Sequence, residues 1–188
     1  MTPILGVIAS SILQAPATQD FESIASTRLT GTQQAITFSS IPQTYKHLQL
    51  RWAGACGDDY LYIKWNSWAS TDRTGRINVT DGTFYPNGSV APDATYGFEL
   101  WQGGVGSSNP GSGVIDFLDY ASTSKSKMIR SQFFKPGYGF SPAQRYSAMS
   151  HLVMYSASTS AINSITFQAK AIYPLIAGTT VSLYGIKG

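Results

Sequence analysis

The side chains best suited to acid–base or metal chemistry are the two imidazoles of this sequence, His47 and His151. Nucleophilic catalysis needs a nucleophile, a base and a group that orients the base. Each histidine stands beside a leucine in a predicted strand, and the chain has neither a Gly-x-Ser-x-Gly nucleophile motif nor a His-x-x-x-His ligand spacing. Both histidines are therefore predicted to be structural, with no catalytic residue and no metal site.

Carboxylate pairs are the next candidates for chemistry. Asp58 and Asp59 are adjacent at a predicted turn, but a hard cation takes about six to eight oxygen ligands from a patterned loop, so a turn role is favoured. Asp116 and Asp119 lie three apart in one predicted strand, where alternation places them on opposite faces. They cannot form a glycosidase pair from that strand alone. We expect no enzyme activity and no cofactor.

Basic residues follow these carboxylates in the sequence, namely Lys125, Lys127 and Arg130. If residues 113–120 and 127–134 form an antiparallel hairpin, carboxylates and cations meet across the two strands. Exposed pairs of this kind contribute about 0.2–1 kcal/mol each. The pattern predicts a structural role for these charges.

Cys56 is the single cysteine and lies in an apolar run. One cysteine excludes an internal disulfide and any multi-cysteine zinc site. A free cysteine in such a setting is usually a small buried hydrophobic residue. We predict that role for Cys56.

Aromatic side chains in or beside predicted loops are open to three interpretations. They suit core packing, a protein interface or glycan contact, because aromatic rings serve all three. The set comprises Trp65, Trp68, Phe84, Tyr85, Tyr96, Trp101, Tyr138 and Phe140. Four of them, Trp65, Trp68, Phe84 and Tyr85, flank or occupy a loop-rich stretch and form the candidate loop contact surface.

The elements that position these residues are short segments of period two bounded by Gly, Pro, Ser or Asn. The pattern predicts strands at 22–30, 34–39, 47–56, 60–66, 96–102, 113–120, 127–134, 146–155, 162–169 and 179–187. No amphipathic helix longer than two turns is predicted. The fold class is all-β, an antiparallel β-sandwich of jelly-roll or Greek-key type.

Two stretches of the sequence lack the alternating strand pattern. Residues 67–95 are rich in turn signals, and residues 103–112 form a glycine- and serine-rich connector. Such loops cluster at one end of a sandwich and offer a contact surface.

In the last predicted strand, the side chains expected to point inward are those of Val181, Leu183 and, with a kink at Gly185, Ile186.

Residues 1–20 are predicted to be an extended N-terminal arm, with residues 21–188 forming the β-sandwich domain. The arm is uncharged over its first 13 residues and contains the apolar residues Ile4, Leu5, Val7, Ile8, Ile12 and Leu13. These six are the predicted partner-binding residues. The run lacks a basic start and falls short of the roughly 20 apolar residues that span a bilayer, so neither a secretory signal nor a membrane partner is expected.

Composition narrows the function class further. Charged residues make up 12% of the 188 residues, and the formal net charge is +3. This charge is small and dispersed, whereas nucleic-acid binding needs clustered Lys and Arg. We expect no nucleic-acid partner. Low charge with 13% aromatic residues fits a protein whose surface is partly covered by partners.

Four segments carry a resemblance to a known family. They are ITFSSIPQTYKHLQLR at 36–51, TPILGVIASS at 2–11, GVIDFLDYA at 113–121 and SLYGIKG at 182–188. Together they resemble a family of tailed-phage virion structural proteins that is common in aquatic phages. The stretch 67–95 carries no recognisable similarity.

The resemblance implies a component of the phage particle, made in the host cytoplasm. A compact domain with an apolar arm favours a capsid cement or decoration protein on the outer capsid surface. Its expected partners are the major capsid protein and itself, as a homotrimer. The alternative is a tail-fibre or receptor-binding protein, an adhesin that would bind a host glycan.

Overall fold

The computed structural model describes residues 20–56, 60–67, 75–80, 96–102, 110–138, 146–156, 158–170 and 172–188. Within these residues the chain forms β-strands and no helix. The strands are β1 (Phe21–Arg28), β2 (Ala35–Phe38), β3 (His47–Gly54), β4 (Tyr60–Trp65), β5 (Gly75–Thr80), β6 (Phe98–Gln102), β7 (Gly111–Leu118), β8 (Lys127–Tyr138), β9 (Tyr146–Ser156), β10 (Ile165–Ala169) and β11 (Thr180–Ile186). The all-β class predicted from the sequence is confirmed.

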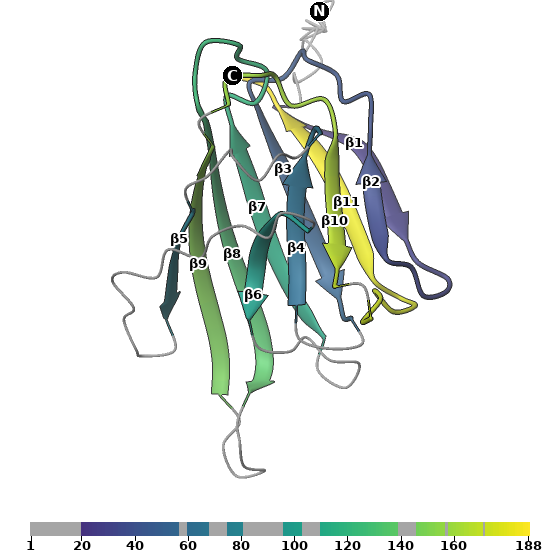
Figure 1. Ribbon diagram of the computed structural model, residues 1–188. Coiled ribbons are helices and arrows are strands. Elements are labelled where there is room, and N and C mark those ends of the chain that lie inside the picture. The colour runs from purple at the N-terminus through teal and green to yellow at the C-terminus, as the bar shows by residue number, and fades with distance from the viewer. Residues whose placement is uncertain are drawn as a thin grey trace, which may run out of the picture.

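The strands form two antiparallel sheets packed face to face (Figure 1). The larger sheet has seven strands in the order β1-β11-β3-β7-β8-β9-β5. The smaller sheet has four, in the order β2-β10-β4-β6. Buried side chains from both sheets form one hydrophobic core between them, which makes the molecule a β-sandwich.

Eight of the strands have the topology of a jelly roll. With β5, β8 and β9 set aside, the first strand pairs with the eighth (β1 with β11) and the second with the seventh (β2 with β10). The third pairs with the sixth (β3 with β7) and the fourth with the fifth (β4 with β6). This is the pattern of one long antiparallel hairpin rolled over so that its strands alternate between two sheets.

The remaining strands β8, β9 and β5 extend the larger sheet beyond β7. β5 falls within residues 67–95, which the sequence predicted to be loop, so that prediction is wrong for residues 75–80. β7 also begins at Gly111, inside the predicted connector 103–112. The three added strands make the larger sheet wider than its partner.

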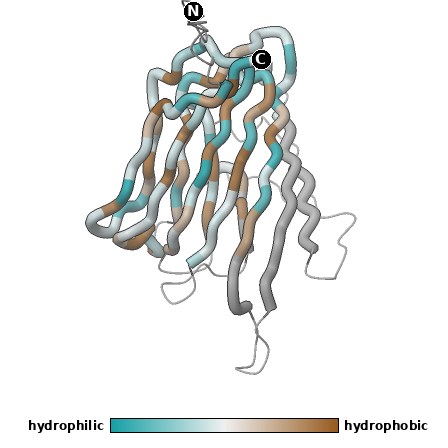
Figure 2. Tube along the Cα trace, turned by 180° about the vertical axis from the view of Figure 1, so that it is seen from behind, coloured by the Kyte–Doolittle hydropathy of each residue, from teal (hydrophilic) through white to brown (hydrophobic). Residues whose placement is uncertain are grey.

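Alternation along the strands builds the core. Leu48, Leu50 and Trp52 of β3 point inward with exposures of 0%, 0% and 4%. Figure 2 shows the same alternation of hydrophobic and hydrophilic residues along several strands. Cys56 is fully buried in this core, as predicted.

β11 departs from its predicted pattern at one position. Val181 and Leu183 are buried as expected, but alternation continues without a kink, so Gly185 takes the inward position and Ile186 the outward one. The ring of Tyr45 lies directly over the Gly185 α-carbon, where a β-carbon would overlap it. The expectation for Ile186 is therefore wrong, because Tyr45 supplies the apolar group that the strand lacks there.

Gly113 of β7 creates space for the cluster of Trp52, Phe133 and Phe167 rings in the core. A β-carbon at Gly113 would lie 2.6 Å from Trp52 Nε1 and 2.8 Å from the Gln132 carbonyl oxygen, and would also overlap the Phe133 ring. The Trp52 indole packs with its centroid 5.4 Å from Phe167. Among the described residues, its buried Nε1 has no hydrogen-bond partner.

Asn66 joins the end of β4 to the segment before β10. Its backbone is left-handed, with φ of 53°, a conformation that asparagine tolerates better than most residues. The side-chain Nδ2 donates to the Ala161 carbonyl at 2.8 Å, and Oδ1 accepts from the Asn163 N–H at 2.9 Å. The smaller sheet is thereby fixed to its crossover connection.

Candidate interaction surface

Trp65 is the one member of the predicted loop contact surface that lies among the described residues. It ends β4 and is 4% exposed. Its ring stacks on Phe98 at 5.2 Å and meets Phe117 edge-on at 6.3 Å. Trp65 therefore belongs to the core and not to the loop surface that the sequence predicted, because its position at the strand end points it between the sheets.

The other predicted contact residues lie outside the described residues. These are Trp68, Phe84 and Tyr85 of the loop surface, and Ile4, Leu5, Val7, Ile8, Ile12 and Leu13 of the arm. Asp58, Asp59 and Phe140 also lie outside them. The predictions for these residues stay predictions. Tyr96 is half-buried, and its ring packs against Tyr62 at 5.2 Å.

The outer face of the larger sheet carries a row of interacting side chains that crosses five strands. At one edge, Phe21 of β1 and Tyr184 of β11 stack with ring centroids 4.9 Å apart. The Arg51 guanidinium of β3 lies 4.8 Å from the Phe21 centroid and 5.1 Å from the Tyr184 centroid. Cation–π contacts of this kind hold an exposed arginine in a defined position.

Gln49 and Asp116 continue the row toward the far edge. Arg51 Nε donates to Gln49 Oε1 at 2.7 Å, and Gln49 Nε2 donates to Asp116 Oδ1 at 2.8 Å. Arg130 of β8 donates to Asp116 Oδ2 from Nη2 at 2.8 Å and from Nε at 3.2 Å. Asp116 and Arg130 are direct partners in the β7–β8 register. The predicted hairpin and its cross-strand ion pair are both confirmed.

Two large apolar side chains flank Arg130 on the same face of β8. Met128 is 48% exposed and Phe134 is 46% exposed. Alternate residues of β8 point the other way, and Ile129, Ser131 and Phe133 are buried. β8 therefore contributes to the core with one face and leaves an apolar and basic row on the other.

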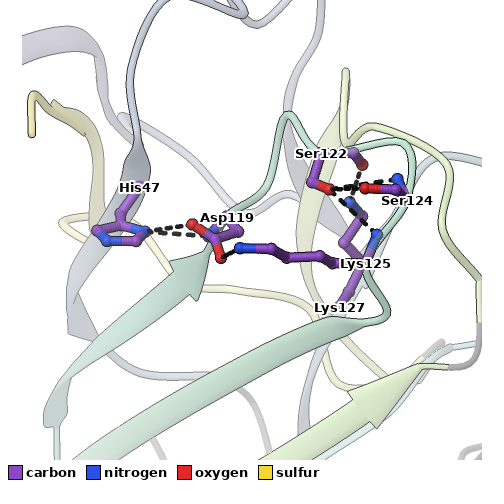
Figure 3. A network of polar contacts seen from close by, with 6 residues as sticks. All are labelled: His47, Asp119, Ser122, Ser124, Lys125 and Lys127. Atoms are coloured by element: carbon purple, nitrogen blue, oxygen red, sulfur yellow. Dashed lines mark hydrogen bonds and ion pairs between the residues drawn. The ribbon is translucent and has the colours of Figure 1, made fainter.

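The β7–β8 turn holds the cluster of polar groups shown in Figure 3. Asp119 lies just past the end of β7 and has a left-handed backbone with φ of 47°. Because it is outside the strand, alternation does not place its side chain on the opposite face from Asp116, as the sequence predicted. Its carboxylate accepts from Lys125 Nζ at 2.7 Å. This hydrogen bond holds the pKa of Asp119 below its ordinary value.

His47 is joined to the same turn through the Asp119 backbone. The Asp119 N–H donates to His47 Nδ1 at 3.0 Å. Because Nδ1 accepts a hydrogen bond there, the imidazole proton is on Nε2, and the 3.8 Å between Nδ1 and Asp119 Oδ1 is a contact without a hydrogen bond. His47 thus anchors the turn to the start of β3.

Lys127 is buried, with 1% exposure, and its Nζ donates to the Ser122 carbonyl. Burial lowers the pKa of Lys127. Ser122 Oγ accepts from the backbone N–H groups of Ser124 at 3.3 Å and Lys125 at 3.1 Å. The cluster contains the residue types of a catalytic site, but its serine hydroxyl is engaged by the turn and not by His47. Its geometry is that of a stabilised turn.

A third polar cluster fixes the edge of the larger sheet. Lys187 Nζ and Tyr45 OH both donate to the Glu22 carboxylate, the latter at 2.9 Å. The hydrogen bond from Lys187, followed by that from Tyr45, lowers the pKa of Glu22. The same bond to Glu22 raises the pKa of Tyr45.

Comparison with family models, curated proteins and solved structures finds no match to this chain. No cluster of three or more His, Cys, Asp or Glu side chains able to hold a metal ion occurs in the described part of the chain. Within the same residues, no helix is long and apolar enough to cross a membrane. The described feature best suited to binding is the outer face of the larger sheet.

Sequence reasoning missed this surface, although a signal for it was present. The segment 127–134 alternates so that Met128, Arg130 and Phe134 fall on one face. An alternating strand with large apolar residues on both of its faces indicates a strand that has a partner on each side.

Proposed function

We propose that the protein is a non-enzymatic structural component of a tailed-phage particle, a decoration protein that binds the outer capsid surface and stabilises the shell. The four segments that resemble phage virion proteins support this assignment, and residues 113–121 contribute part of the β7–β8 hairpin. The major capsid protein is the proposed partner. Residues 1–20 are proposed to lie against it.

The observation that carries the proposal is the composition of the outer face of the larger sheet. Protein interfaces are enriched in aromatic residues, Met and Arg. The face presents Phe21, Tyr184 and Arg51 at one edge, and Met128, Arg130 and Phe134 on β8. Its polar groups are already hydrogen-bonded to one another, so covering them costs less desolvation than covering isolated charges.

A particle that lacks the protein provides the test. A decoration protein binds a surface that exists only in the assembled shell, so it stabilises the shell by mass action. Phage produced without this gene product should adsorb to host cells normally but release DNA at a lower temperature than wild type. The protein should also occur in purified virions at a copy number comparable to that of the capsid subunits.

The tail-fibre alternative predicts the opposite outcome. Particles without an adhesin keep their thermal stability but fail to adsorb to the host. In that case the copy number follows that of the tail. Normal shell stability together with lost adsorption would therefore replace the decoration proposal with the receptor-binding one.

A further inference from the structure

The exposed row on β8 has the layout of an interface centre. Met128, Arg130, Gln132 and Phe134 occupy successive outward positions, which spans about 20 Å at the rise of an antiparallel strand. Arginine, methionine and aromatic side chains are among the residue types enriched at protein interfaces. The row lies on a strand that hydrogen bonds fix on both sides, to β7 and to β9.

The described side chains of this face have a net positive charge. Arg28, Arg51 and Arg130 are exposed on the outer face of β1, β3 and β8. The carboxylates near them are both paired. Gln49 and Arg130 donate to Asp116, whose side chain is 14% exposed, and Lys125 donates to Asp119 at the β7–β8 turn. The arginines outnumber these two carboxylates, so the face presents a net positive charge to a partner.

This charge argues against a second copy as the occupant. Two copies placed with these faces together would set arginines near arginines, and the shielded Asp116 could not relieve the repulsion. Like charges placed together at an interface cost several kcal/mol. The occupant is instead a different chain with the opposite charge.

We propose that the outer face of β8, centred on Arg130 and flanked by Met128 and Phe134, docks an acidic surface of another virion protein. This proposal rests on the proposed function, because it names the partner chemistry of a decoration protein. Carboxylates of the partner pair with the arginines, and apolar groups of the partner cover Met128 and Phe134. The partner surface is flat, to match a sheet.

A matched pair of substitutions at one position tests the sign of the charge. Gln132 is exposed, lies between Arg130 and Phe134, and is not bonded to Asp116. We expect Gln132→Glu to weaken rebinding of the purified protein to particles that lack it by about ten-fold or more. Gln132→Lys should bind at least as tightly as wild type. Lys64→Glu on the smaller sheet, a charge reversal away from the face, should leave binding unchanged.

The apolar anchors have their own test. The double variant Met128→Ser with Phe134→Ser should lose about 30-fold or more in affinity for the same particles, as expected when hot-spot residues are truncated. Both side chains are about half exposed in the free protein, so its thermal melting should be nearly unchanged. Unaltered binding by this variant and by Gln132→Glu would overturn the docking surface while leaving the decoration function standing.

Photo-crosslinking identifies the occupant directly. A benzophenone amino acid at position 134 in protein bound to virions should cross-link to another virion protein within a segment rich in Asp and Glu. The same group at position 64 serves as the control. Cross-links from position 134 to a second copy of this chain, or to DNA, would overturn the proposal. Absence of the protein from purified virions would instead refute the proposed function itself.

Discussion

Gly113 has no side chain at the point where the Trp52 and Phe133 rings approach β7. We expect Gly113→Ala to lower the free energy of unfolding by about 1–3 kcal/mol, because added atoms in a packed core force their neighbours off position. Gly31 is a matched control, since no described atom beyond its two chain neighbours lies within 4 Å of a β-carbon there. Gly31→Ala should be neutral or slightly stabilising. Urea unfolding of both variants measures the difference, and equal effects would contradict this account of the core.

Glu22 makes stability depend on pH at the sheet edge. Its pKa is lowered from the ordinary 4.5, chiefly by the hydrogen bond from Lys187. A carboxyl with a lowered pKa in the fold contributes stability that is present above pH 4.5 and is lost as the pH falls through the folded value. Glu22→Gln should therefore unfold at a lower urea concentration than wild type at pH 7.

The difference in stability between the two proteins should narrow as the pH falls below 4.5 and through the lowered pKa of folded Glu22, because the carboxyl then becomes protonated in the folded state as well. Lys187→Met is the control, because it removes the largest cause of the shift and should show the same convergence. A gap between wild type and Glu22→Gln that stays constant from pH 7 to pH 2 would rule out this linkage.

Individual residues were predictable from sequence where a local rule decided their role. Strand alternation and the hairpin turn brought Asp116 and Arg130 together, and an apolar run indicated burial of Cys56. Trp65 was assigned to the surface because it adjoins a turn-rich stretch. Its burial depends on Phe98 and Phe117, which are distant in sequence and which no local pattern connects to it.

Asn66 shows how one side chain can fix an element. Asn66→Ala removes the two short side-chain hydrogen bonds, worth about 0.5–1.5 kcal/mol each, together with a longer one from the Ser164 N–H at 3.4 Å. It also adds about 1–2 kcal/mol for a left-handed residue with a β-carbon. We expect a loss of about 2–5 kcal/mol. Asn66→Gly loses the same bonds but adopts this φ freely, so its loss should be smaller by about 1 kcal/mol. Chemical denaturation of both variants tests the difference, and an Ala variant as stable as the Gly variant would contradict it.

Ten of the strands could be predicted from the sequence, because each is a segment of alternating apolar and polar residues bounded by turn residues. β5 was missed because Gly75–Thr80, GRINVT, begins with glycine and arginine and stands among turn residues. Its strand conformation comes from pairing with β9, a partner about 70 residues later in the chain. Tertiary pairing of this kind overrides weak local preference.

At the scale of the whole molecule, the sequence favours self-association. The domain has few charged residues at its strand edges to block association with another chain, and it is rich in aromatic residues. We expect light scattering of the purified protein to give three times the 20.3 kDa of one chain. The trimer contact should lie away from the basic face of β8, so Gln132→Glu should remain trimeric. A monodisperse monomer at micromolar concentration that stays monomeric when mixed with capsids would refute the trimer.

The choice between a jelly roll and another Greek key could not be made from the sequence. Topology depends on which strands pair, and the decisive pairs join residues far apart, such as Thr27 with Val181 and Phe38 with Ile165. Alternation reports that a strand has a buried face but not which strand lies beside it. The β-sandwich could therefore be predicted from the sequence, but the order in which its strands pair could not.

The position of β11 between β1 and β3 has a consequence for biosynthesis. The ribosome makes this strand after all the others described, yet it lies inside the larger sheet, between the edge strand β1 and β3. Until β11 emerges, β1 has no described neighbour in the sheet and one edge of β3 is unpaired. Unpaired strand edges can pair with other chains and cause aggregation. A nascent chain therefore cannot close its larger sheet early, and pairing over so long a separation is slow. The yield of folded protein in a cell should then depend on chaperones that shield those edges during translation.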